Sequence, residues 1–424
     1  MPKAFTVIDL GYGDSGKGAI TDLLVRKTGA RMVVRHSGGA QCSHNVVTPG
    51  GVHHAFHQFG SGTLAGAATL LSRFVIVNPI TFLWESDELH EKSPEQPVYV
   101  DENCLVTLPH HVALNRYREH LRGINRHGSC GMGIGETVSY ALAYPATALR
   151  VQDIEKPDFL LRVHAVVQDL SVIVTDVSGV QTSATDRILA CFQVKDLHPL
   201  VDTFREFTRR VKVVSSSQAA ELISVGDSIF EGSQGVLIDG DYGFHPYTTW
   251  ADTTLRNANA LAVEAGVRTA NIGVTRTYMA RHGPGPVVTE VDLSARELHN
   301  VTNDWQGPMR TGWFDAVALK YALAVVGGRI DWLAVTHVDA LRPNWRAGVR
   351  YFDGDSQDFP IQILNPLDLQ AREQQTERLW GARAVYSTPI APADVVQYIS
   401  SALELPVGIT MGGPRATDVD KYIL

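Results

Sequence analysis

The sequence predicts an α/β protein with a large, mostly parallel central sheet and helices on both of its faces. The first observation is an apolar, β-rich segment at residues 4–10 that runs directly into a glycine-rich loop at 11–18. The second is the alternation of short Val- and Ile-rich segments with segments of helical spacing along the chain. Strands that alternate with helices are typical of parallel sheets whose crossover helices cover both faces.

The individual elements follow from local patterns. An apolar helix is expected to start at residues 21–25, and a positively charged helix is expected at 111–122. A further helix is predicted at 316–326, and the polar stretch 352–375 is expected to form surface loops with a strand. The other segments that resemble strands are short and apolar, and they lie at residues 31–35, 70–77, 228–231, 270–275 and 332–336.

Composition restricts the class of protein. No internal repeat, low-complexity tract or linker is visible, so residues 1–424 are predicted to form one domain with long functional loops. The chain has 37 Lys and Arg against 45 Asp and Glu, a formal charge of −8. This mild acidity argues against a protein dedicated to non-specific nucleic-acid binding.

The chain shows no targeting or membrane signal. No window of about 18 apolar residues is present, and the N-terminus resembles a first strand more than a signal peptide. The four cysteines have neither metal-ligand spacing nor the density of a disulfide framework. They are Cys42, Cys104, Cys130 and Cys191. We therefore expect a cytoplasmic protein with no membrane or nucleic-acid partner.

The glycine-rich loop GYGDSGKG fits the pattern G-x-x-x-x-G-K of nucleotide-binding loops. Its glycines allow backbone N–H groups to converge on phosphate oxygens, and Lys17 adds a positive charge. Gly18 stands where such loops usually carry the hydroxyl that holds Mg²⁺, so the metal needs another ligand. Asp14 is the nearest candidate, either as that ligand or as a base toward a substrate. The alternative is a strand–helix turn that binds nothing.

Together with this loop, several motifs resemble those of the adenylosuccinate synthetase family over nearly the whole chain. They are GDSGKGA at 13–19, RHSGGAQCSHN at 35–45, SCGMGIG at 129–135, FEGSQGVLID at 230–239, HPYTT at 245–249, RTGWFD at 310–315, THVD at 336–339 and GGP at 412–414. That family uses GTP to phosphorylate the 6-oxo group of IMP and then displaces the phosphate with the amine of L-aspartate. The resemblance implies a P-loop-like GTP-binding ligase fold, a homodimer and a role in purine biosynthesis.

The resemblance also implies roles for matching residues. Asp14 corresponds to the catalytic base and Mg²⁺ ligand, and the Ser43 carbonyl to a second Mg²⁺ ligand. His44 corresponds to the catalytic acid, Gln234 to the residue that holds the 6-oxygen, and Lys17 neutralises phosphate charge. The residues implied to bind GTP are Gly13, Ser15, Gly16, Lys17, Gly18, His337, Asp339 and Gly413. The residues implied to bind the nucleotide substrate and the amine are Gln41, Ser129, Cys130, Gln234, Thr249, His282 and Arg310.

The departures from the family gather on the acceptor side. The loop whose arginines clamp the carboxylates of L-aspartate falls at residues 303–313, where Arg310 is what remains of the arginine run. A family threonine becomes Cys130, an apolar residue becomes His282, and the arginine that reaches across the dimer falls near Ala146. A dicarboxylate amine needs forked cationic donors, so these changes indicate a different amine, or else a different base or phosphate on the nucleotide.

The resemblance implies that Asp339 recognises the guanine of GTP. The family lysine that stacks on the guanine is replaced by His337 in this chain. The sequence thus predicts a GTP- and Mg²⁺-dependent carbon–nitrogen ligase that joins an IMP-like nucleotide to an amine or amino acid. It predicts a paralogue of specialised metabolism with an altered amine donor. One alternative is an ordinary adenylosuccinate synthetase in which other arginines compensate. The other is a GTP-binding regulatory protein without ligase activity, which would need neither Asp14 nor His44.

Overall fold

The computed structural model describes residues 4–176, 182–294, 305–354 and 357–423. Its centre is a ten-stranded sheet with the order β20-β19-β15-β11-β1-β10-β2-β5-β7-β9. Neighbouring strands are parallel except at one edge, where β20 is antiparallel to β19. The strands of this sheet are β1 (Ala4–Asp9), β2 (Met32–Arg35), β5 (Ala68–Leu71), β7 (Val98–Asp101), β9 (Lys212–Val214), β10 (Ser228–Glu231), β11 (Thr269–Arg276), β15 (Trp332–Thr336), β19 (Val407–Met411) and β20 (Val419–Tyr422).

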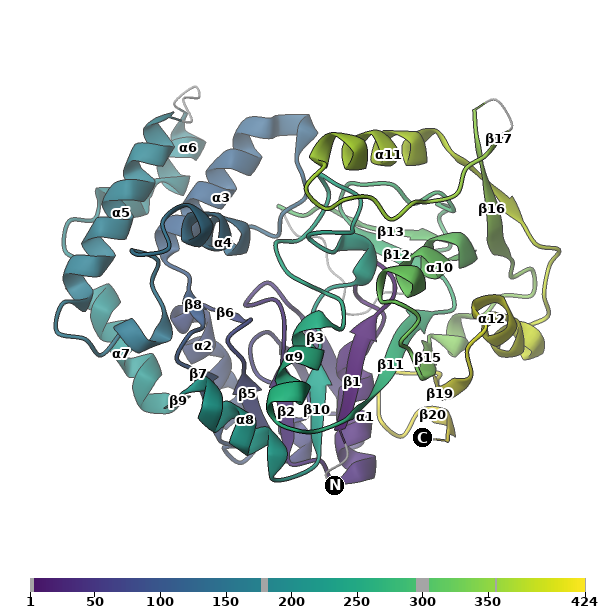
Figure 1. The fold of residues 1–424 in the computed structure, drawn as a ribbon, viewed down its shortest axis with the longest axis horizontal. Coiled ribbons are helices and arrows are strands. Elements are labelled where there is room, and N and C mark those ends of the chain that lie inside the picture. The colour runs from purple at the N-terminus through teal and green to yellow at the C-terminus, as the bar shows by residue number, and fades with distance from the viewer. Residues whose placement is uncertain (1–3, 177–181, 295–304, 355–356, 424) are drawn as a thin grey trace.

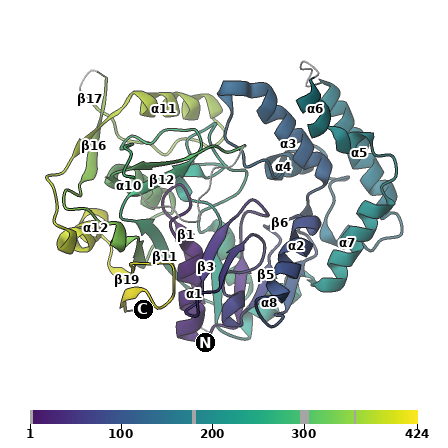
Figure 2. The same ribbon diagram turned by 180° about the vertical axis from the view of Figure 1, so that it is seen from behind.

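Helices cover both faces of this sheet, as the sequence predicts. On one face α1 (Lys17–Thr28) packs its apolar side chains against β1, β2 and β11, and Figure 2 shows α1 in front of the strands. On the opposite face α8 (Ser216–Ser224) and α9 (Arg256–Glu264) pack against β2, β5 and β10, and α9 is in front in Figure 1. The central strands are therefore buried on both sides, which explains their continuous apolar sequences.

Two further groups of elements flank the sheet (Figure 1). A helical group lies beside the β7 and β9 edge and shares one apolar core with β7. It consists of α2 (Pro79–His90), α3 (Pro109–Arg122), α4 (Ile134–Ala143), α5 (Phe159–Asp176), α6 (Ser183–Ile188) and α7 (His198–Arg210). A mixed group at the other side consists of α10 (Ala316–Val325), α11 (Leu369–Gly381), α12 (Val395–Leu403), β14 (Phe314–Asp315), β16 (Ala347–Asp353), β17 (Gln357–Asp358) and β18 (Arg383–Tyr386).

Short strand pairs shape the rim above the carboxyl ends of the central strands. They are β3 (His44–Val47) with β4 (His53–Phe56), β6 (Ile76–Val77) with β8 (Leu105–Val106), and β12 (Met279–His282) with β13 (Met309–Gly312). Two of these pairs carry residues that the sequence analysis assigns to a site, His44 on β3 and His282 on β12.

Most of the predicted elements are present, and three differ in extent. The first helix begins at Lys17, inside the glycine-rich loop, because Gly16 takes a left-handed conformation directly before it. Residues 70–77 are not one strand, since a turn in which the Val75 N–H donates to the Ser72 carbonyl separates β5 from β6. The polar stretch 352–375 includes the start of α11, whose first turn the Asp368 side chain caps.

Two findings concern the remaining sequence predictions. Over the described residues, no helix has the length and apolar character needed to cross a membrane. The four cysteines, all of which lie in described segments, form no disulfide.

Candidate active site

The glycine-rich loop joins β1 to α1 at the carboxyl end of the central strands. Asp14 and Gly16 have φ angles of 52° and 92°, the left-handed conformation found where N–H groups converge in anion-binding loops. Side chains from β11 and β15 fix the loop. Arg276 Nε donates to the Asp14 carbonyl at 2.7 Å, and Thr336 Oγ1 donates to the Ser15 carbonyl at 2.8 Å.

A second loop, after β10, packs directly on the first. A Cβ atom at Gly235 would lie 2.2 Å from the Gly11 carbonyl oxygen and 2.4 Å from the Gly13 nitrogen, so only glycine allows this approach. The packing places Gln234 beside the glycine-rich loop, where its Nε2 donates to Cys42 Sγ at 3.3 Å. Within the described part of the chain, Gln234 Oε1 is buried without a hydrogen-bond partner. The predicted 6-oxygen residue thus lies next to the phosphate loop with part of its amide unused.

The imidazole of His44 is held by a buried carboxylate. His44 Nδ1 donates to Glu231 Oε1 at 2.8 Å, and Glu231 ends β10 with its side chain inaccessible to solvent. The same carboxylate accepts hydrogen bonds from the Ser61 hydroxyl and, at 3.0 Å, from the Ser61 N–H, and Arg35 Nε lies 3.8 Å away. These contacts fix the ring plane and direct the Nε2 atom away from Glu231.

The charge states of this pair are set by burial and by mutual attraction. Burial lowers the pKa of His44 to about 4, although the Glu231 carboxylate opposes this shift. Burial alone would raise the pKa of Glu231, but His44 and Arg35 hold it at about 2. At neutral pH the pair therefore consists of a carboxylate and a neutral imidazole that carries its proton on Nδ1.

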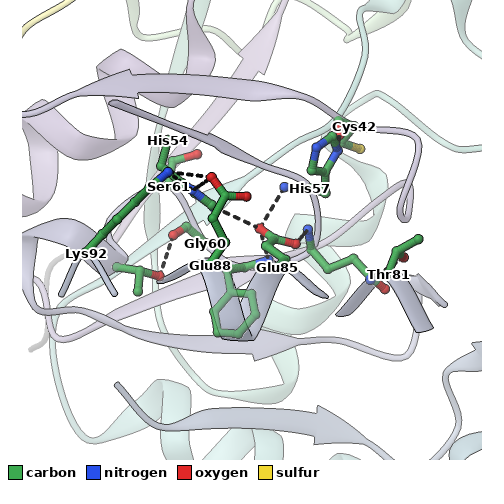
Figure 3. Close-up of polar contacts among 12 residues, drawn as sticks. Cys42, His54, His57, Gly60, Ser61, Thr81, Glu85, Glu88 and Lys92 are labelled. Atoms are coloured by element: carbon green, nitrogen blue, oxygen red, sulfur yellow. Dashed lines mark hydrogen bonds and ion pairs between the residues drawn. The ribbon is translucent and has the colours of Figure 1, made fainter. Parts of the chain in front are cut away.

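A second buried carboxylate, that of Glu85, holds the loop that follows β4 (Figure 3). Glu85 of α2 accepts hydrogen bonds from the N–H groups of His57 and Gln58, each at 2.8 Å, and from Phe59 at 3.3 Å. The His57 ring faces Cys42, and its Nδ1 donates to the Cys42 carbonyl at 2.5 Å. Because Cys42 also accepts from Gln234, this network joins α2, the His44 loop and the Gln234 loop.

Asp14 faces a histidine from the neighbouring strand pair. His282 Nε2 lies 3.7 Å from Asp14 Oδ2, and 30 % of the Asp14 side chain is exposed. His282 Nδ1 is buried and has no hydrogen-bond partner among the described residues. No group of three His, Cys, Asp or Glu side chains in those residues could hold a metal ion. A metal at Asp14 would thus depend on backbone carbonyls, water and ligand phosphates.

The arginines near the predicted amine pocket are occupied by the protein itself. Arg310 Nε and Nη2 both donate to the carboxylate of Glu290, and Nη1 donates to the carbonyls of Gly283 and Gly285 at 2.9 and 2.8 Å. Arg281 and Arg276 are the arginines that could compensate. Arg281 likewise donates from all three nitrogens to backbone carbonyls, and Arg276 donates to the Asp14 carbonyl and the Tyr278 hydroxyl. Burial lowers the pKa of Arg281 to about 10. Neither Arg310 nor Arg281 is left to grip a carboxylate.

The other predicted substrate residues lie on loops at the rim. Ser129 Oγ donates to Asn115 Oδ1 at 2.8 Å, and burial raises the pKa of the Cys130 thiol to about 11. Both side-chain polar atoms of Gln41 are buried without a partner in the described residues. The N–H of Thr249 donates to the Ile238 carbonyl at 2.8 Å, which anchors its loop beside that of Gln234.

A tryptophan from the altered loop lies on this rim. A Cβ at Gly131 would come within 2.8 Å of two atoms of the Trp305 indole, so the ring rests on the glycine. Arg116 lies over the same ring at 5.6 Å from its centroid. The predicted amine loop thus contributes an aromatic surface here; its residues 303 and 304 lie outside the described residues.

The predicted guanine residues follow β15. His337 has a φ of 57°, and Asp339 is exposed two residues later. Burial of part of the carboxyl, together with the charges of Asp418 and Asp420, raises the pKa of Asp339. A Cβ at Gly413 would lie 2.5 Å from Asp418 Oδ2, so this glycine permits the close turn. Thr336 connects this region to the phosphate loop through its hydrogen bond to Ser15.

Sequence reasoning did not assign roles to four residues that hold the site together, and they are Asp9, His57, Glu85 and Glu231. Glu231 lies inside a quoted motif, and Asp9 is a charged residue at the end of an otherwise apolar strand, so both gave a signal. His57 and Glu85 gave none, because their partners are distant in sequence.

Comparisons with known proteins give one consistent family. A family model described as adenylosuccinate synthetase matches residues 6–419. The adenylosuccinate synthetase of Tolumonas auensis is 30 % identical over 440 residues, which cover 98 % of this chain and 97 % of the relative. That of Pseudoalteromonas atlantica is 28 % identical over 437 residues, with the same coverage.

Solved structures share the fold. The fully ligated adenylosuccinate synthetase from Plasmodium falciparum matches with a TM-score of 0.79 at 18 % identity, over 99 % of both chains. Succinoaminodeoxyadenylate synthetase of cyanophage S-2L, bound to dGMP and to dATP as an energy donor, matches with a TM-score of 0.59 at 16 % identity. That match covers 100 % of this chain and 96 % of the cyanophage protein.

Proposed function

Although the chain belongs to the adenylosuccinate synthetase family and is a GTP-dependent carbon–nitrogen ligase, we propose that its amine donor is not L-aspartate. On this proposal the enzyme phosphorylates the 6-oxo group of an IMP-like purine nucleotide and then displaces that phosphate with a less acidic amine. It is a paralogue of specialised metabolism. The observation that carries the proposal is the engagement of every Arg310 nitrogen by Glu290 and the 283–285 turn.

L-Aspartate would bring two carboxylates into the site. Each must lose water on entering the site, and an unpaired buried charge costs on the order of 1–3 kcal/mol or more. To bind a carboxylate through Nε and Nη2, Arg310 would have to leave Glu290, whose side chain is 43 % exposed. Trp305, which rests on Gly131, supports an amine with an aromatic or apolar part.

Phosphoryl transfer would use residues of the phosphate loop and of the loops that pack beside it. Asp14 takes the proton from purine N1, so that electron density moves to the 6-oxygen. This oxygen attacks the γ-phosphorus while the bond from that phosphorus to the β–γ bridging oxygen breaks, and GDP leaves. Gln234 holds the 6-oxygen through its side-chain amide. Lys17 neutralises charge on the transferring group, and His44 takes up a proton on Nε2 when the triphosphate is near and then donates to a γ-phosphate oxygen. The amine nitrogen then bonds to C6 as the phosphate leaves.

The available donors suit Mg²⁺. Asp14 offers a partly exposed carboxylate, and Ser43, an exposed residue, offers a backbone carbonyl; both are hard oxygen ligands. Mg²⁺ commonly binds one or two protein oxygens and completes its shell with water and substrate phosphates. When bound, the ion would neutralise charge on the phosphate oxygens.

The proposal also covers recognition of the guanine of GTP and the oligomeric state. Asp339 accepts hydrogen bonds from N1–H and the exocyclic amine of guanine, so GTP is preferred over ATP. The family resemblance supports a homodimer, which sedimentation analysis of the free protein would test.

A substrate screen tests the proposal. The protein is mixed with Mg²⁺, GTP and either IMP or dGMP, and each mixture receives one amine from a panel. The panel holds L-aspartate, neutral aliphatic and aromatic amino acids, and hydroxylamine. GDP release gives the rate, product mass identifies the adduct, and Asp14→Asn provides the background.

We expect an adduct with a neutral amine and a kcat/KM for L-aspartate at least about tenfold lower. An L-aspartate KM in the ordinary range of roughly 1 μM–1 mM, with adenylosuccinate as product, would return the chain to the ordinary synthetase. GDP release without any adduct would favour the regulatory GTP-binding alternative.

A further inference from the structure

A buried carboxylate lies directly under the phosphate loop. Asp9 is the last residue of β1, and 1 % of its surface is exposed. Its Oδ1 accepts the N–H of Gly11 at 2.8 Å. Its Oδ2 accepts the N–H of Ser15 at 2.9 Å and the ammonium of Lys17 at 3.1 Å. Lys17 is also buried, with 3 % of its side chain exposed.

These donors are of the kind that a phosphate loop offers to a nucleotide. In G-x-x-x-x-G-K loops the backbone N–H groups cradle phosphate oxygens, and the lysine reaches the β- and γ-phosphates. Here one carboxylate holds the lysine and two N–H groups at normal hydrogen-bond lengths. The Asp9 carboxylate is therefore an internal anion that pairs with the ammonium and N–H groups that the loop would otherwise leave unpaired in the absence of nucleotide.

We propose that Asp9 competes with the phosphates of the nucleotide for Lys17 and for the Ser15 N–H. Binding of a triphosphate requires Lys17 to leave Asp9 for the phosphate oxygens, and the affinity of the loop is lower by the strength of that contact. Asp9 thus sets nucleotide affinity without touching the nucleotide. This inference rests on the proposed function, in that it takes the loop to be the nucleotide site.

The competition has a signature that a purely structural role would not give. Removing the Asp9 charge leaves Lys17 buried without its partner in the free protein, which lowers stability. The same change removes the competitor and the negative charge next to the phosphates, which strengthens nucleotide binding. A residue that merely shapes the loop would lose stability and affinity together.

The experiment compares the full-length protein with Asp9→Asn and Asp9→Ala. Isothermal titration with Mg²⁺ and the non-hydrolysable analogue GTPγS gives the Kd, and thermal unfolding gives Tm with and without the analogue. Asp22→Asn is the matched control, since Asp22 is another buried carboxylate of this region that pairs with a cation, Arg26, at 2.8 Å. It lies in α1 and touches none of the loop N–H donors in the described contacts.

We expect both Asp9 variants to have a lower Tm without the nucleotide and a Kd lower by between about tenfold and a hundredfold, the range of a charge-assisted hydrogen bond. Asp22→Asn should lower Tm and leave the Kd unchanged. Equal or weaker binding by both Asp9 variants, with the natural protein binding normally, would overturn this inference alone. Absence of binding by all forms would overturn the proposed nucleotide site as well. The alanine variant decides if the asparagine variant does not fold.

Discussion

Gly18 shows how one residue can be explained only by its neighbours. It takes the place of the Mg²⁺-binding hydroxyl of other phosphate loops, and a Cβ there would lie 3.0 Å from His44 Cβ and 3.2 Å from the Asn45 carbonyl oxygen. The first turn of α1 thus approaches β3 so closely that no side chain fits without movement. The glycine makes room for His44, the proposed acid.

This contact gives a prediction for Gly18→Ala. Alanine favours the helix by roughly 0.5–1 kcal/mol over glycine, so stability should change little while His44 is displaced. We expect kcat to fall by about tenfold or more, because small shifts of catalytic groups are costly. Steady-state kinetics with GTP would measure it. Gly381→Ala, where no atom lies within 4 Å, is the control. An unchanged kcat would mean that the β3 backbone shifts to accept the methyl group while the His44 imidazole keeps its position.

The Glu231–His44 pair gives a second prediction at this scale. A glutamine at position 231 can donate to Nδ1, which favours the tautomer with its proton on Nε2 and removes the charge that favours protonation of His44. We expect Glu231→Gln to lower kcat by roughly 10²–10⁴ with a smaller change in KM for GTP. Because His44 must carry its proton to act as an acid, the alkaline limb of the kcat profile should also shift to lower pH. Glu264→Gln, at an exposed ion pair with Arg73, should leave both parameters as they are. A KM effect without a kcat effect would assign Glu231 to binding.

At the scale of elements, α3 shows how one helix start can make the fold sensitive to acid. His111 is the third residue of α3, and its Nδ1 accepts the N–H of Leu108 at 3.0 Å. Burial, with a smaller contribution from His110, lowers the pKa of His111 to about 3. The folded protein thus needs this ring neutral, because a proton on Nδ1 would remove the acceptor.

The sign of the pH dependence follows from this shift. Between pH 6.5 and about 3 the unfolded chain binds a proton at His111 that the folded chain does not, so stability is complete above pH 6.5 and falls as the pH is lowered. His111→Gln keeps an acceptor at the same helix position and does not titrate. The loss of unfolding free energy from pH 7 to pH 5 should be smaller in the variant by about 2 kcal/mol, measured by urea unfolding. An identical loss in both proteins would mean that His111 is solvated in the native state.

For the whole molecule, the arrangement of the site predicts cooperative behaviour. The phosphate loop, the His44 loop, the Gln234 loop and the guanine residues come from β1, β3, β10 and β15, and hydrogen bonds join them across the sheet. Residues 1–424 are predicted from the sequence to form one domain, and these hydrogen bonds tie the site to several strands of the central sheet.

Thermal unfolding tests this single-domain prediction. We expect one transition that moves as a whole when Mg²⁺ and GTPγS are added. At a ligand concentration of 100 times Kd the gain is about 2.7 kcal/mol, which for a chain of 424 residues corresponds to a rise in Tm of about 3 °C. Calorimetry would show it. Two transitions, of which the ligand moves one, would divide the chain into separate folding units.

The sequence by itself determined the fold class, the phosphate loop and the family. Strands such as 228–231 and 332–336 are buried on both faces, so their apolar runs could be recognised locally. Gly13 and Gly16 of the phosphate loop have φ angles of 106° and 92°, so the need for glycine there lies in the local backbone conformation. Features of this kind depend on neighbours in the chain, and the sequence contains those neighbours.

Tertiary structure alone decided which charges are free. From the sequence, Arg310 is expected to be free to bind a carboxylate, but in the structure it is bound to Glu290 and the 283–285 turn. Lys17 is expected to be a free cation, but in the structure it is paired with Asp9. The fold brings His57 into a hydrogen bond with the Cys42 carbonyl and Glu85 into one with the His57 N–H, and neither contact could be identified from the sequence. A side chain's available charge depends on the partners within hydrogen-bond distance, and that distance is fixed by packing between segments far apart in sequence.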